Sequence, residues 1–238
     1  MNNSKKWSLA FLIWTGFPIR VLEIPKIYKY LEPLTPGDWA QAEIWEQVQI
    51  DFFKMNPLWW TQQSQNLEWI ENQNIQISLI GDSSYPLNLI EWPSPPPILT
   101  WIGSSQWLKG HHLAVVGSRN MSSESRRWIE NYLPPVLGRY PLLLLSGGAR
   151  GTDQLAHSIC LRGGTRTACF LPSGLLNPYP NEIHDWIEAI VEAGGSVVSS
   201  FHPRVAMRKH YFHLRNHLIS GLSGLVFAID GRRKSGTM

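Results

Sequence analysis

Apolar residues recur at helical spacing over the first third of the chain. The spacing predicts helical segments within residues 7–14 and 39–52, and Pro33, Pro36 and Pro57 separate such segments. Residues 1–75 also contain seven tryptophans, interspersed with leucine and isoleucine. This pattern favours the packed core of a small helical domain over an exposed aromatic surface that stacks bases.

From residue 75 onward, short apolar runs alternate with helical patterns. The runs predict strands at residues 75–80, 98–103, 113–116, 142–145, 167–171, 196–201 and 225–229. Helices are predicted between the last five strands, at residues 122–133, 155–161, 182–193 and 213–222. Strands that are apolar throughout and alternate with helices indicate an α/β fold, a parallel sheet with helices on both faces. We therefore predict two domains, residues 1–75 and residues 76–238.

Glycine and serine gather directly after the predicted strands, where open α/β sheets bind their ligands. Gly117 and Ser118 follow the run 113–116, and Ser146, Gly147, Gly148 and Gly151 follow the run 142–145. Such turns are expected to leave amide N–H groups free at helix N-termini, an arrangement that binds phosphate.

Two polar residues behind the second turn allow alternative interpretations. Asp153 is either the cap of the following helix or a ligand contact. His157 either faces the site or is a packed histidine.

The charge is divided unevenly along the chain. The first 111 residues carry a net charge of −3 and the remainder carries +6. Residues 193–229 lack acidic side chains but contain Arg204, Arg208, Lys209 and Arg215 with four histidines. A stretch of this kind indicates either a polyanionic partner or an ordinary solvated loop.

Several signatures of enzymes are absent from the sequence. There is no P-loop, no G-x-G-x-x-G after the run 113–116, no G-x-S-x-G and no H-E-x-x-H, and no pair of carboxylates stands out. Two cysteines cannot form a metal cluster and indicate buried thiols in a reducing compartment. With no bilayer-length apolar run and no signal peptide, we expect a cytoplasmic protein with no cofactor, metal or membrane association.

Taken together, the motifs resemble the DNA-processing protein A (DprA/Smf) family. Each is weak singly, but they follow the family's order across residues 75–238. They are Gly81-Asp82 with Tyr85-Pro86, Gly117-Ser118-Arg119, Ser146-Gly147 with Ala149, Gly151, Asp153 and Ala156-His157, Gly174-Leu175 with Tyr179-Pro180, Arg215-Asn216 with Ser220-Gly221-Leu222-Ser223, and Ser235-Gly236.

The resemblance implies an extended Rossmann-like fold that binds single-stranded DNA in a basic pocket at the strand ends. It also implies a non-enzymatic homodimer that loads a RecA-type recombinase during natural transformation, in competent cells. Arg119, Arg166 and Arg215 would contact phosphates, beside Asn216 and the amides of Gly117, Ser118 and residues 147–151. Phe212 would either stack on a base or anchor the loop.

The sequence departs from the family pattern at several positions. His217 stands where arginine is usual, Leu176 where aspartate is common, Ser200 where glutamate is common, and Pro172 where glycine is typical. We interpret the domain 76–238 as truncated, because the family normally continues with a helix, a strand and sometimes a winged-helix domain.

Two alternatives to a recombination mediator remain. One is a nucleotide-hydrolysing enzyme of the phosphoribohydrolase type, whose glycine motif is echoed by residues 148–152 but without the expected downstream glutamate. The other is a degenerate interaction protein that does not bind DNA, which the histidine at 217 and the chain end favour.

Overall fold

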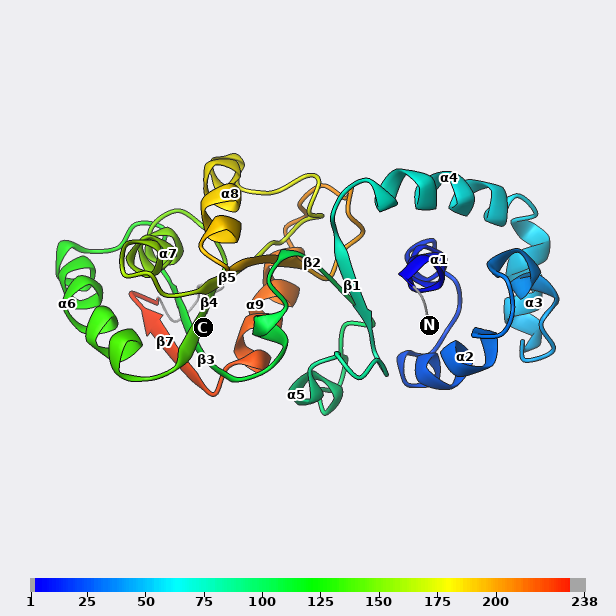
Figure 1. The fold of residues 1–238 in the computed structure, drawn as a ribbon, viewed down its shortest axis with the longest axis horizontal. Coiled ribbons are helices and arrows are strands. Elements are labelled where there is room, and N and C mark those ends of the chain that lie inside the picture. Colours follow the sequence, from blue (N-terminus) through cyan, green and yellow to red (C-terminus); the bar gives the residue numbers. More distant parts are fainter. Residues whose placement is uncertain (1–2, 232–238) are drawn as a thin grey trace. The chain divides into compact units, whose positions relative to one another are not determined.

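Residues 3–231 are described in the computed structural model and form two compact units (Figure 1). The first unit contains the chain up to Tyr85 together with Pro93–Leu99. The second contains Pro86–Trp92 and the chain from Thr100 onward. The chain therefore passes between the units three times. The division into domains at residue 75 stays a prediction, and the Ser235-Gly236 pair lies outside the described residues.

The first unit is helical, as the spacing of apolar residues predicts. Its α-helices are α1 (Asn3–Trp14), α2 (Ile24–Leu31), α3 (Gln47–Met55) and α4 (Trp59–Glu71), with 3₁₀ turns η1 (Val21–Glu23) and η2 (Pro36–Gln41) and strand β1 (Gln76–Leu79). A capping box begins α3, in which the side chains of Glu46 and Gln49 satisfy each other's backbone N–H groups.

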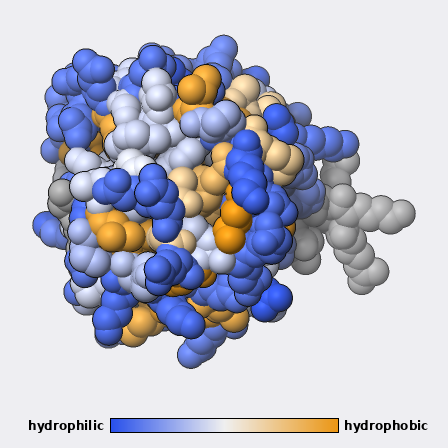
Figure 2. All heavy atoms as spheres, turned by 90° about the vertical axis from the view of Figure 1, so that its right-hand side faces the viewer, coloured by the Kyte–Doolittle hydropathy of each residue, from blue (hydrophilic) through white to orange (hydrophobic). Residues whose placement is uncertain are grey.

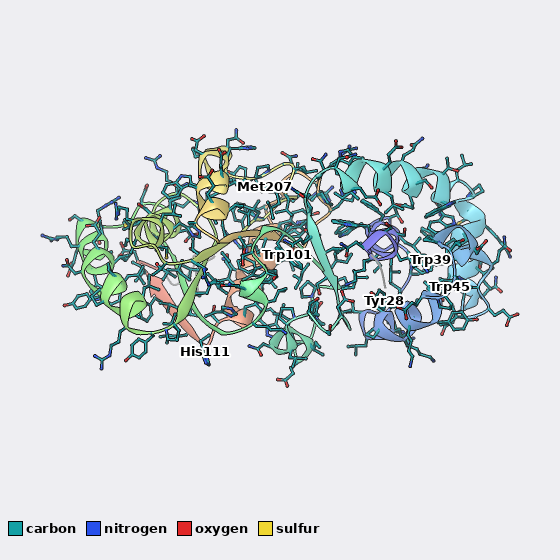
Figure 3. All side chains as sticks on the ribbon, in the orientation of Figure 1. Tyr28, Trp39, Trp45, Trp101, His111 and Met207 are labelled. Carbon is teal, nitrogen blue, oxygen red and sulfur yellow. The ribbon has the colours of Figure 1, made fainter. Side chains whose placement is uncertain are left out.

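The tryptophans of this unit build its core. Trp39 is fully buried and Trp45 nearly so, among the helices (Figure 3). Trp39 stacks on Trp59 with ring centroids 6.4 Å apart, and Trp45 meets Phe17 edge-on at 5.2 Å. The prediction of a tryptophan core is confirmed for these buried residues. The face of this unit seen in Figure 2 is mostly hydrophilic, with small, separate hydrophobic patches.

The second unit alternates strands and helices. Its strands are β2 (Ile98–Gly103, whose first two residues belong to the first unit), β3 (His111–Gly117), β4 (Leu142–Ser146), β5 (Thr167–Phe170), β6 (Ser196–Ser199) and β7 (Leu225–Ile229). Its α-helices are α5 (Leu87–Ile90), α6 (Ser123–Arg139), α7 (Thr152–Arg162), α8 (His184–Glu192) and α9 (Tyr211–Leu222), with η3 (Gln106–Leu108) and η4 (Asn181–Ile183).

The strands form one sheet in the order β1-β2-β6-β5-β4-β3-β7. The strands β3 to β7 run parallel, with Leu113 of β3 opposite Leu144 of β4 and Leu225 of β7, whereas β2 runs antiparallel to β6. The chain steps from β3 to β4, β5 and β6 in one direction, then returns through α9 to place β7 on the other side of β3. In Figure 1, α8 lies above the sheet and α9 below it. The order therefore reverses beside β3, which creates a topological switch point.

One predicted helix boundary is wrong. The segment predicted to end at residue 133 continues as α6 to Arg139, through Pro134 and Pro135. Both prolines are exposed, so the carbonyls that lose a helical N–H partner lie on the solvent side. Leu133 and Leu137 meanwhile remain buried in the core shared with β3, β4 and α7. Core packing therefore outweighs the loss of two helical hydrogen bonds.

Candidate nucleic-acid interface

A groove of about 1130 Å³ opens where the carboxyl ends of β3 and β7 lie side by side. We call it the switch-point groove. Its walls are the turn after β3, the end of β7, the turn after β4 and the beginning of α9. The lining includes Gly117, Ser118, Arg119, Asn120, Ala149, Asp153, Tyr179, Met207, Lys209, Phe212, His213, Arg215, Asn216 and Asp230. Met207, in the loop between β6 and α9, is labelled in Figure 3. The site thus lies at the sheet position that α/β folds use for ligands.

Two guanidinium groups lie close to one aromatic ring in this groove. The Cζ atom of Arg119 lies 5.2 Å from the ring centroid of Phe212, and that of Arg215 lies 5.8 Å from it. Tyr179 meets the same ring edge-on at 5.9 Å. Both cations are within the range of cation–π attraction. Arg119 is exposed, whereas Arg215 is buried, so only Arg119 presents its charge freely to solvent.

Arg215 forms a buried ion pair beneath the groove. Its Nη1 atom lies 3.9 Å from Oδ2 of Asp153 and donates a 3.1 Å hydrogen bond to the carbonyl of Phe170. Burial raises the pKa of Asp153, while the charge of Arg215 and the amides of Ala149 and Gly147 oppose that shift. Removing either partner would leave an uncompensated charge inside the protein. Arg215 is thus held by the floor of the groove.

Two of the amides in the turn after β4 that the sequence predicts to be free have a partner inside the protein. The Ala149 amide donates to Oδ2 of Asp153 at 3.2 Å, and the Gly147 amide also hydrogen-bonds this carboxylate. A Cβ atom at Gly147 would lie 1.3 Å from Nη1 of Arg215, so only glycine fits beneath that guanidinium. Asp153 therefore occupies the place where a phosphate was expected, because the carboxylate satisfies the same N–H donors internally.

The turn after β3 also differs from the prediction. The Ser118 amide donates to the carbonyl of Ile229 at 3.0 Å and is therefore not free. Gly151 has φ +91°, and a Cβ atom there would meet the carbonyl oxygens of Ser118 and Arg119 at 2.6 and 2.5 Å. These close approaches pack the two turns against each other. The glycine-rich turns thus shape the floor, the Ser118 amide already has a partner inside the protein, and a contact of Ser118 with DNA stays a prediction.

Three further predicted residues have internal partners. The Ser146 hydroxyl donates to the carbonyl of Val115 at 2.6 Å inside the sheet. Arg166 precedes the amino end of β5, opposite the carboxyl ends that form the groove, and donates to Gln106. His157 is buried with Nδ1 2.8 Å from Oγ1 of Thr167, and burial lowers its pKa to about 3. Of its two interpretations, the packed histidine is confirmed.

Two cations and one aromatic residue of the site were not assigned to it from the sequence, although Lys209 and Tyr179 lie in segments singled out there. Lys209 lines the switch-point groove, and Arg150 lines an adjoining hollow of about 300 Å³ together with Arg119, Gly147 and Phe212. Arg150 lies within the glycine-rich turn and Lys209 within the acid-free stretch, so both signals were present. Tyr179 became recognisable only once the fold brought it to Phe212. His217 meets Trp92 edge-on at 5.9 Å and is absent from the groove lining.

The described residues 3–231 contain no group of three or more histidine, cysteine or acidic side chains that could hold a metal ion. Both cysteines are buried and unpaired, and burial raises the pKa of Cys160 to about 11 and that of Cys169 to about 12. Within the same part of the chain, no helix has the length and hydrophobicity needed to cross a membrane.

Comparisons with known proteins give matches in sequence and in fold. The profile of a family described as DNA recombination-mediator protein A matches residues 76–238. Protein Smf of Synechocystis is 33% identical over 180 residues, covering 73% of this chain and 44% of that protein. DNA processing protein DprA of Bacillus subtilis is 29% identical over 167 residues, covering 70% of this chain and 56% of its own length. The chain spans about half the length of the curated relatives it matches.

Two solved structures are also similar. The crystal structure of DNA processing protein A from Streptococcus pneumoniae superimposes with a TM-score of 0.72 at 26% identity, covering 98% of this chain and 80% of that one. The Helicobacter pylori protein, described by its single-stranded DNA binding mode, gives a TM-score of 0.59 at 26% identity, covering 68% of this chain and 73% of its own. The likeness to the Streptococcus pneumoniae structure agrees with the α/β fold and the helical first unit.

Proposed function

The chain belongs to the DNA recombination-mediator protein A (DprA/Smf) family, and from that premise we propose that it binds single-stranded DNA in the switch-point groove. The carrying observation is that the Arg119 guanidinium lies 5.2 Å from the ring centroid of Phe212, with Lys209 and Asn216 in the same lining. A guanidinium can hold a phosphate oxygen pair while the aromatic ring beside it stacks on a base. That combination suits a strand whose bases are not paired.

The residues of the groove take different roles in this proposal. Arg119 and Lys209 contact phosphates, Phe212 stacks on a base, and Asn216 hydrogen-bonds the strand. Arg215 supports Phe212 from below. The remaining predicted site residues shape the floor and place these side chains: Gly117, Ser118, Ser146, Gly147, Gly148 and Gly151.

The proposal also includes a mediator's role without catalysis. The one carboxylate at the strand-end turn, Asp153, is buried against Arg215, which does not favour its action as an acid or base on a bound nucleotide. Family membership supports the further proposals of a homodimer and of loading of a RecA-type recombinase in natural transformation. The position of His217 outside the groove lining removes one reason to regard the chain as degenerate.

A fluorescence-anisotropy titration tests the proposal. Labelled oligo-dT should bind more tightly than the matching duplex, because the groove is built for phosphates and unpaired bases and presents no recognition helix. Arg119→Ala should weaken oligo-dT binding and reduce the log–log salt slope by roughly 0.7, with little change in melting temperature. The exposed Arg139→Ala is the matched control. Equal or tighter duplex binding, or an unchanged slope in a stable Arg119→Ala variant, would contradict the proposal.

A further inference from the structure

A second cavity continues from the switch-point groove onto the helical face of the second unit. It has a volume of about 450 Å³ and lies among α6, α7 and α8. We call it the α6–α7 cavity. It shares Arg119, Asn120 and Met121 with the groove, and its other lining residues are Arg126, Glu130, Arg150, Gly151, Gln154, Leu155, Ser158, Arg162 and Trp186. Because three residues line both hollows, the cavity directly adjoins the groove.

The charge of the α6–α7 cavity is strongly positive. Four arginines line it against one acidic residue, Glu130. Glu130 lies 3.5 Å from Arg126, but both side chains are about half exposed. An exposed pair one helical turn apart contributes little free energy, so Arg126 can exchange this partner for an anion. Arg150 and Arg162 are exposed as well.

The arginines are arranged along a line. Gly151, Gln154, Leu155, Ser158 and Arg162 recur at the spacing of one helical face, so one side of α7 forms the cavity floor. Thr152 and Arg162 begin and end α7, which places them about 15 Å apart at the helical rise. Arg119 and Arg150 lie at the first end and Arg162 at the second. A compact anion such as free phosphate could contact only one end, whereas an extended polyanion could contact both.

Trp186 adds an aromatic wall to this positive line. It lies on α8, is partly exposed, and lines the cavity. The acidic residues of α8, such as Asp185 and Glu188, are absent from the lining. An indole beside several guanidinium groups is the combination that binds single-stranded nucleic acid, with phosphates on the cations and a base on the ring.

We infer that the α6–α7 cavity is a second binding subsite for the same DNA strand, which runs from the switch-point groove past Arg119 and Arg150 towards Arg162. The inference rests on the proposed function of the groove. Arg126 and Arg162 contact phosphates that a short oligonucleotide held in the groove does not supply. Trp186 stacks on a base of this outer segment. The subsite therefore sets the length of strand that one chain covers.

The length of the oligonucleotide distinguishes binding in the switch-point groove from binding in the α6–α7 cavity. Anisotropy titrations would use an oligo-dT of about 5 nucleotides and one of about 20, which bracket the usual site sizes of single-strand binders. Arg126→Ala and Arg162→Ala should each weaken binding of the long oligonucleotide by about threefold to tenfold. The double variant should lower its salt slope by roughly 1.4. Binding of the short oligonucleotide should stay unchanged. Trp186→Ala should show the same selectivity for length.

Arg127→Ala is the matched control, because it removes the same charge from the same helix, and Arg127 is outside the cavity lining. The inference is overturned if Arg162→Ala behaves like Arg127→Ala, or if it weakens short and long oligonucleotides equally. A third outcome would also overturn the inference: a nucleoside triphosphate binds the wild-type chain but not Arg162→Ala, and this variant still binds the long oligonucleotide normally. The cavity would then hold free nucleotides. If the wild-type chain binds neither oligonucleotide, the proposed function itself fails.

Discussion

The two units use aromatic side chains for different purposes. In the first unit, Trp39, Trp45 and Trp59 are buried and contact one another or phenylalanine. In the second, Phe212 and Tyr179 are only partly buried at the groove, and Phe212 lies within cation–π distance of two arginines. The charge follows the same division, with −3 over the first 111 residues and +6 over the rest. An abundance of aromatic residues therefore does not by itself indicate a nucleic-acid surface, and the proposed one rests on an aromatic residue beside several cations.

The largest effect is expected from the tryptophan core. Trp39→Ala should lower the free energy of unfolding by about 5 kcal/mol, the upper end for such truncations, because the side chain is fully buried. Chemical denaturation followed by circular dichroism measures this loss. The partly buried Trp60→Ala should cost much less. Where the chain remains folded, oligo-dT affinity should be unaffected, and a matching loss of affinity would contradict the division of roles.

The buried ion pair should give a smaller but still large effect. Asp153→Ala should cost about 3 kcal/mol, because it leaves the Arg215 charge buried without its partner. Combining it with Arg215→Met should recover part of this loss in a double-mutant cycle measured by urea denaturation. Glu130→Ala breaks the exposed pair with Arg126 and should change stability by less than about 1 kcal/mol. Additive losses in the double variant would show that the pair is not coupled.

The smallest effect, over the first pH unit below pH 6.5, concerns the pH dependence of stability. The pKa of His157 is lowered to about 3 in the folded chain from an ordinary value near 6.5, so below pH 6.5 the unfolded chain binds the proton first. The contribution of His157 to the free energy of unfolding is thus complete above pH 6.5. It is lost on acidification towards pH 3, by about 1.4 kcal/mol per pH unit. Denaturation curves across this range should be flatter for His157→Gln, with the exposed His184→Gln as control. Parallel curves for wild type and His157→Gln would contradict this.

Much of the fold can be predicted from the sequence because the parallel strands are short apolar runs bounded by turn residues. The continuation of α6 past Pro134 could not be, since it depends on Leu137 reaching a core built from distant segments. The antiparallel direction of β2 is likewise a result of tertiary pairing with β6, nearly a hundred residues away.

The position of the candidate site could be predicted from the sequence, but the contacts of its individual atoms could not. The glycine-rich turns correctly mark the strand ends that line the groove. Their amides were assigned to phosphate because the sequence cannot show that Asp153 folds back onto them. Arg166 is adjacent in sequence to β5 but lies at its amino end, away from Arg119. Which of these residues contact DNA stays a prediction.

The route of the chain between the two units has a consequence for how this protein can be divided. Because Pro86–Trp92 belongs to the second unit while Pro93–Leu99 returns to the first, no single cut separates one from the other. A cut at any one point in this region leaves residues of one unit attached to the other. The units are therefore not exchangeable modules in the usual linear sense. Any swap of the helical unit for another would have to carry over the segment of residues 93–99 as well.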